Sequence, residues 1–275
     1  MGIHLNYNSH FSHVLNNCNE FTPWYFRLAS TWSDHSGSLL IFISWLCFCN
    51  LFVKDVQAQK IAAFLILGLL IYSFLNCNPF SIAANEHSQN DLNPSLQDPH
   101  LLIHPPILYL GQSLSILLFV NSPFSAIKYL KKISLICFLL VSAGIILGSR
   151  WAYSELGWGG FWFWDPVESI SLLSFLPLLA IIHLPENIKG FYVRILSLLV
   201  FPIIMLATCI TRAGVLNSIH SFANGEEHLW WLLSYAGIIV LVTTFLFTVT
   251  FKNEKDREFK PNLKLMPFYF IIFYM

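Results

Sequence analysis

The chain has 275 residues, of which 56% are hydrophobic and only 11% charged, and its formal net charge is zero. A soluble domain carries about a quarter charged residues, so the composition excludes an ordinary soluble protein and indicates a membrane protein. The neutral balance does not suggest a nucleic-acid partner, and six scattered cysteines without a C-x-x-C pair predict neither a disulfide framework nor a zinc site.

Seven apolar segments have the length and composition of membrane-spanning helices, for which about 20 apolar residues are needed. They are residues 37–53, 61–76, 106–122, 133–149, 169–184, 191–211 and 229–251. An eighth apolar segment begins at Met266 and contains ten residues, too few to cross a bilayer. The sequence therefore predicts an all-α polytopic membrane protein with about seven spanning helices and a truncated eighth.

Lysine and arginine are concentrated in alternate loops. Twelve of the fifteen follow the first, third, fifth or seventh segment, whereas the other loops and the N-terminus hold only Arg27, Arg150 and Arg212. The positive-inside rule then predicts an outward N-terminal segment (1–36), a transmembrane domain (37–251), and an inward basic loop followed by the start of the truncated helix (252–275). Nine of the ten histidines lie on the outward side or at its membrane edge.

The stretch LNPSLQDPHLLIHPPILYLG, residues 92–111, contains the first histidine of interest. His104 precedes Pro105 and Pro106 at the predicted start of a helix. A single interfacial histidine is usually structural. The two prolines restrain the backbone, however, and a restrained imidazole suits metal ligation.

The stretch GWGGFWFWDPVES, residues 157–169, combines indole rings with two carboxylates. Its aromatic residues are Trp158, Phe161, Trp162, Phe163 and Trp164. Asp165, Pro166 and Glu168 predict an N-cap, a first-turn proline and a capping box. An interfacial aromatic belt with this cap explains part of the segment, but the density of rings beside three glycines favours a platform for a large planar ligand such as a porphyrin.

The stretch TRAGVLNSIHSFA, residues 211–223, places Arg212 and His220 at the outer end of the sixth segment. His104 and His220 are then two imidazoles on one side that flank the aromatic platform, an arrangement that allows ligation of haem iron from both faces. Arg150 and Arg212 are candidates to pair with the haem propionates, because outward arginines are rare here.

His183 is the one histidine predicted at membrane depth, near the inner end of the fifth segment. An ionisable residue inside a bilayer is by default a functional candidate. The alternative is a neutral imidazole that is hydrogen-bonded to a neighbouring backbone carbonyl.

These segments resemble the CcmF family, the haem lyase subunits of the cytochrome c maturation system. WGGFWFWDPVE is similar to the tryptophan-rich WWD signature of that family, and the flanking stretches quoted above, together with PWYFRLASTWSDHSGSLL (23–40), are similar to its outward loops. The resemblance covers about residues 20–225. It implies an outward haem on a platform that includes Trp158, Trp162, Trp164 and Asp165, between His104 and His220. It also implies a b-type haem in the membrane with His183 as one ligand.

The family further implies a role as one subunit of a haem lyase complex, which acts by positioning and redox control rather than through an acid or a nucleophile. Haem would arrive on the chaperone CcmE and be joined to the CxxCH thiols of apocytochrome c, with a CcmH-type thiol protein as another partner.

The chain departs from the family in having no counterpart to its first helices or to its C-terminal half. We therefore expect a separately encoded C-terminal CcmF fragment to supply the second ligand of the membrane haem. Split chains of this kind are typical of mitochondrial genomes, so the expected location is the mitochondrial inner membrane, with the WWD loop facing the intermembrane space; a bacterial inner membrane is the alternative.

Two other functions are compatible with a histidine-containing membrane protein. A b-type electron-transfer cytochrome would place two histidine pairs within the bilayer, whereas this sequence predicts one intramembrane histidine. A haem transporter would be expected to show internal repeats and interrupted helices, and the sequence has no evident repeat. No role is predicted for His4 or His87, and their substitution is expected to leave the outward haem unchanged.

Overall fold

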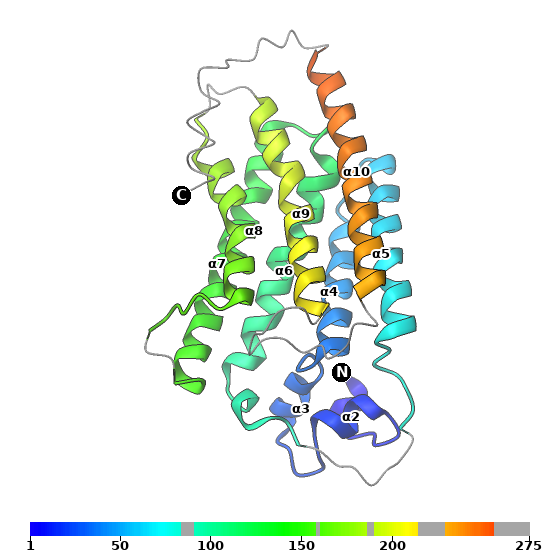
Figure 1. Ribbon diagram of the computed structural model, residues 1–275, viewed down its shortest axis with the longest axis vertical. Coiled ribbons are helices and arrows are strands. Elements are labelled where there is room, and N and C mark those ends of the chain that lie inside the picture. Colours follow the sequence, from blue (N-terminus) through cyan, green and yellow to red (C-terminus); the bar gives the residue numbers. More distant parts are fainter. Residues whose placement is uncertain (84–90, 158–159, 186–189, 214–228, 256–275) are drawn as a thin grey trace.

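A computed structural model describes residues 1–83, 91–157, 160–185, 190–213 and 229–255 (Figure 1). The short elements are α1 (Gly2–Leu5), α2 (Ser12–Asn17), α3 (Trp24–Ser30) and the 3-10 turn η1 (Pro94–Leu96). The long helices are α4 (His35–Asn50), α5 (Val56–Asn76), α6 (His100–Asn121), α7 (Ile127–Glu155), α8 (Pro166–His183), α9 (Gly190–Arg212) and α10 (Leu229–Lys255).

The all-α polytopic architecture predicted from the sequence is confirmed. Within the described ranges, six helices, α5 to α10, are long and apolar enough to cross a membrane. The first predicted segment forms α4, a shorter apolar helix of 16 residues, which rises about 24 Å at 1.5 Å per residue. The truncated eighth segment lies outside the described residues.

The long helices form a bundle in which consecutive helices run in opposite directions (Figure 1). The elements α1 to α3 lie at one end, termed here the outer end, together with the starts of α4, α6 and α8. Helix α6 packs against α4, α7 and α9. Its contact with α7 is close because a Cβ on Gly144 would lie 2.9 Å from the Cα of Leu108, and small residues allow membrane helices to approach in this way.

Two predicted helices are too short in a way that affects the site. Helix α6 begins at His100 rather than at residue 106, and α7 extends over Ile127–Glu155 rather than 133–149. Hydropathy marks the part of a helix that suits lipid, whereas these two helices continue into more polar sequence at their ends. As a result His104 lies in the second turn of α6 instead of before it, and Arg150 lies on α7 instead of in a loop.

Candidate functional site

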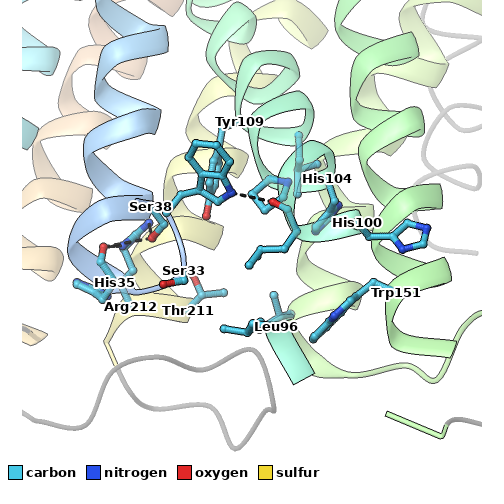
Figure 2. A pocket seen from close by; sticks show the side chains of 15 residues that line it. Ser33, His35, Ser38, Leu96, His100, His104, Tyr109, Trp151, Thr211 and Arg212 are labelled. Atoms are coloured by element: carbon cyan, nitrogen blue, oxygen red, sulfur yellow. Dashed lines mark hydrogen bonds between the residues drawn. The ribbon is translucent and has the colours of Figure 1, made fainter. Parts of the chain in front are cut away.

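A cavity of about 170 Å³ lies at the outer end of the bundle (Figure 2). Residues from the α3–α4 junction, α6, α7, the start of α8 and the end of α9 line it. Its polar and aromatic lining consists of Trp32, Ser33, His35, Ser38, His100, His104, Tyr109, Trp151, Thr211 and Arg212. The rest of the lining is apolar, so the cavity combines an apolar wall with a few polar groups that can orient a ligand.

His104 is fixed in this cavity by the backbone of α7. Its Nδ1–H donates to the carbonyl of Gly144 at 2.7 Å. Its ring also lies against Gly148, where a Cβ would come within 2.6 Å of the ring Cε1 atom. A hydrogen bond from one ring nitrogen to a carbonyl sets the tautomer that presents the other nitrogen, here Nε2, to a metal.

The prolines that follow His104 are accommodated inside the helix by a neighbouring indole. Pro105 has no N–H, so the carbonyl of Leu101 loses its partner in the helix. The Nε1–H of Trp32 donates to that carbonyl at 2.7 Å, and both Trp32 and Leu101 line the cavity. The expected restraint on His104 is therefore present, through packing between helices rather than through a fixed helix start.

Arg212 supplies a buried positive charge to the cavity. The side chain is 8% exposed and donates to the carbonyl of His35 at 2.7 Å and to Ser38 Oγ at 3.0 Å. Among the described residues that line the cavity, none is acidic. Since a buried cation is stabilised by an opposite charge, the cavity favours an anionic group such as a carboxylate.

Arg150, the other arginine predicted to pair with a haem propionate, lies outside the cavity. It is exposed, and its Cζ atom lies 5.8 Å from the centre of the Tyr153 ring. Tyr153 in turn stacks on Phe161, with ring centres 5.1 Å apart and planes within 3° of parallel. Arg150 therefore lies beside residues 160–165, termed here the aromatic segment.

The predicted capping box at the start of α8 is confirmed. Asp165 Oδ2 accepts from the N–H of Val167 at 3.0 Å, and Glu168 Oε2 accepts from the N–H of Asp165 at 3.3 Å. Glu168 Oε2 also accepts from the N–H of Phe163 at 3.1 Å. The two carboxylates thus anchor the aromatic segment to the first turn of α8.

This anchoring presents several rings at the surface. Trp164 is 71% exposed, and its φ of 58° lies in the left-handed region, which is rare for a residue other than glycine and common at functional sites. Trp162 packs edge-to-face on Trp164 at 5.9 Å, and its buried Nε1–H has no hydrogen-bond partner among the described residues. Trp158 lies outside those residues.

His183 is the last residue of α8, at the end of the bundle opposite the cavity. Its side chain is exposed, and its Nδ1–H donates to the carbonyl of Leu179 at 2.9 Å. The hydrogen bond expected under the structural alternative is therefore present; the same bond would also leave Nε2 for a metal. Lys131 Nζ donates to the carbonyl of Leu184 at 2.7 Å and thereby holds this end of α8 against α7.

Several cavity residues were not identified from the sequence. His100 lies one helical turn before His104, and Trp151 lies seven residues after Gly144, so helical periodicity would have placed each beside a residue of the site. The short helix predictions hid this periodicity. His220, the other predicted ligand of the outward haem, lies outside the described residues.

The fold and the cavity define a polytopic α-helical membrane protein with a histidine-containing site at its outer end. Residues 32–216 match the family model described as cytochrome C assembly protein, a range that contains every described residue of the cavity lining. The chain belongs to the cytochrome C assembly protein family, and the resemblance inferred from its motifs is confirmed.

Individual relatives agree with this assignment. The chain is 31% identical to the cytochrome c-type biogenesis protein CcmF of Pseudomonas aeruginosa, over 86% of this chain and 40% of the relative. It is 32% identical to CcmF of Escherichia coli, over 90% and 42%, and 33% identical to the cytochrome c-type biogenesis protein NrfE of Haemophilus influenzae, over 90% and 43%. The chain thus spans about 40% of the length of these bacterial relatives.

Proposed function

We propose that this chain acts in cytochrome c maturation as a haem-handling subunit of a haem lyase complex. The observation that carries the proposal is the setting of His104: its Nδ1–H is engaged by Gly144, and its ring lines a cavity that also contains the buried Arg212. The names of the relatives, which are cytochrome c-type biogenesis proteins, support the same role.

The chemistry of the lining fits a haem substrate. Imidazole nitrogen is a common axial ligand of haem iron, and an arginine in a cavity without acidic lining suits a propionate. The cavity of about 170 Å³ is smaller than the roughly 300–1,000 Å³ of pockets that enclose a small molecule. A bound haem would therefore extend out of the cavity. It would reach toward the aromatic segment, which directly precedes the lining residue Val167 in the chain.

In this proposal the residues divide into three groups. His104 and His220 are the axial ligands of the outward haem. Trp158, Trp162 and Trp164 contact its ring, while Asp165 holds their segment in place. Arg212 pairs with a propionate from within the cavity, and Arg150 does so from beside the aromatic segment.

The bound haem would supply vinyl groups that accept the CxxCH thiols of apocytochrome c. In such an addition the S–H bond breaks, a C–S bond forms, and the hydrogen is transferred to the other vinyl carbon, so no net oxidation occurs. The residues of this chain would bind and orient the reactants, the contribution expected of a protein when its ligand carries the chemistry.

The proposed partners and location follow from the same assignment. They are apocytochrome c, the haem chaperone CcmE, a CcmH-type thiol protein, and a separate polypeptide that corresponds to the C-terminal part of CcmF. The proposed membrane is the mitochondrial inner membrane, with the bacterial inner membrane as the alternative that the named relatives represent.

The aromatic platform can be tested by replacing Trp164 with Ala. This side chain is mostly exposed, so its loss is expected to lower the haem content of the purified chain while the thermal unfolding temperature stays near that of the wild type. Asp165→Asn is the matched control, because asparagine also caps helices and the change should leave haem content nearly unaltered. Unchanged haem content in Trp164→Ala would favour a simple aromatic belt.

A further inference from the structure

A chain of hydrogen bonds that the proposed function does not use links α1, α2, α3 and α4. His4 Nδ1 lies 2.7 Å from Ser30 Oγ, His4 Nε2 lies 2.7 Å from His13 Nδ1, and His13 Nε2 lies 2.8 Å from Asp34 Oδ1. These four residues are termed the N-terminal relay. His4 and His13 precede the part of the chain that matches the family model.

The relay is buried although it consists of polar groups. His4 is 1% exposed, His13 5% and Ser30 0%. Buried polar groups of this kind are stable only when their hydrogen bonds are satisfied. The relay therefore stabilises the docking of α1 and α2 as long as each of its bonds is intact.

The link between the two imidazoles depends on their protonation. Two ring nitrogens 2.7 Å apart share one hydrogen, which requires one nitrogen to donate and the other to accept. The pair can therefore carry no extra proton or one, and both states keep the link. A second proton would turn both nitrogens into donors, which breaks the bond and places two positive charges in a buried site.

The surroundings of His4 oppose its protonation. Burial, followed by the proximity of His13 and of the α-amino group, lowers the pKa of His4 to about 3, while Asp34 acts in the opposite direction. Cys18, at the end of α2, lies with its Sγ 3.8 Å from His4 Nδ1, and Arg27 of α3 and Asp91 interact electrostatically with that thiol.

Asp34 remains an anion in this setting. Burial raises its pKa, but hydrogen bonds from His13, the N–H of Gly37 and Asn17 outweigh burial and lower the pKa to about 2.

The relay and the cavity share one wall. Asp34 is the N-cap of α4 and accepts from the N–H of Gly37 at 2.8 Å. The residues on either side of it line the cavity: Trp32, Ser33, His35 and Ser38. Gly37 allows the close approach of the relay, since a Cβ there would lie 2.8 Å from His13 Nε2 and 1.9 Å from the carbonyl oxygen of Thr31.

We propose that His4, His13 and Asp34 are positioning residues that hold the cavity wall formed by Trp32–Ser38, and that a second proton on the histidine pair releases this wall in acid. The proposal rests on the proposed function only in naming haem as the ligand of the cavity. Its consequence is a site that binds its ligand well near neutral pH and loses affinity in mild acid.

The direction of the pH dependence follows from His4. Because its pKa in the folded protein lies below the ordinary 6.5, its contribution to docking is complete above about pH 6.5 and is lost progressively as the pH falls toward 3. Each pH unit below 6.5 changes the docking equilibrium by at most a factor of about ten. At pH 5 the undocked population should therefore rise by at most about thirtyfold.

The test uses the full chain in detergent micelles at pH 8, 7, 6 and 5. Backbone hydrogen exchange of residues 1–38, corrected for the intrinsic effect of pH on exchange, reports the docking of the wall, and haem content is measured on the same samples. Exchange is expected to rise and haem content to fall below pH 6.5 in the wild type. In His4→Gln, which cannot be charged, both curves should be flat over this range. His10→Gln, which removes an exposed histidine of the same segment, should behave like the wild type.

Each outcome bears on a separate claim. Exchange of the wild-type wall that stays constant from pH 8 to pH 5 would overturn the relay, even if His4→Gln does not fold. Exchange that rises without loss of haem would overturn its coupling to the site. A wild type that binds no haem at pH 8 would contradict the proposed function and leave the exchange result as the measure of the relay.

Discussion

Replacing Gly148 with Ala is expected to lower the haem content of the outward site while the bundle stays folded. The new Cβ would lie 2.6 Å from Cε1 of His104 and 3.0 Å from its Nε2. The imidazole has little freedom to retreat, because its Nδ1–H is bonded to Gly144. If the imidazole moves to relieve this overlap and must return to bind iron, a strain of about 1–3 kcal/mol lowers haem affinity by roughly fivefold to 150-fold.

The same substitution should not weaken the helix itself, because Ala in the middle of a helix is about 0.5–1 kcal/mol more favourable than Gly. Gly237→Ala in α10 is the matched control, since a Cβ at that position has no neighbour within 4 Å. Haem content per chain and the unfolding temperature are measured for both variants. If Gly148→Ala retains the haem content of the wild type, His104 does not need its present position to hold haem.

The second large effect concerns the b-type haem that the resemblance to CcmF implies within the membrane. A low-spin b haem needs two axial ligands, and His183 is exposed at the end of α8. Met205, a methionine within the sixth apolar segment, is fully buried in α9. We therefore expect the isolated chain, supplied with haem, to lack a stable bis-histidine b haem and to acquire its spectrum when the C-terminal part of CcmF is co-expressed.

Low-temperature absorption spectra of the two preparations provide the measurement. In the co-expressed sample His183→Ala should abolish the b-haem signal, whereas Met205→Leu, which conserves volume, should leave it unchanged. A stable bis-histidine spectrum in the isolated chain, lost in His183→Ala, would refute the shared ligation while keeping His183 as a ligand.

Local sequence was sufficient for some features of the site. The capping box at Asp165 and Glu168 depends on four consecutive residues and was predicted correctly, because its hydrogen bonds are formed within one helical turn. The alternating direction of the helices could likewise be predicted, since each crossing is an apolar segment and the basic residues are concentrated in alternate loops. The Trp-rich segment was identified by its composition, and the exposure of Trp164 was compatible with either interpretation of it.

Other features depend on contacts between distant parts of the chain. The restraint on His104 comes from Gly144 and Gly148, about forty residues away, and the carbonyl freed by Pro105 is satisfied by Trp32, 69 residues earlier. The N-terminal relay joins residues 4, 13, 30 and 34 through side chains that follow no helical or strand period. Neither periodicity nor motif spacing reports such contacts, so the sequence predicts no role for His4.

Rescue with imidazole tests whether His104 ligates haem at the outer end of the bundle. His104→Ala and His220→Ala are purified with and without added imidazole, and the haem content and low-temperature spectrum of the outward site are recorded. His100→Ala, one turn away in the same cavity, is the matched control. Each ligand variant is expected to lose the outward haem and to regain it with imidazole, whereas His100→Ala is expected to keep it. Wild-type haem content in His104→Ala without imidazole would show that His104 is not a haem ligand.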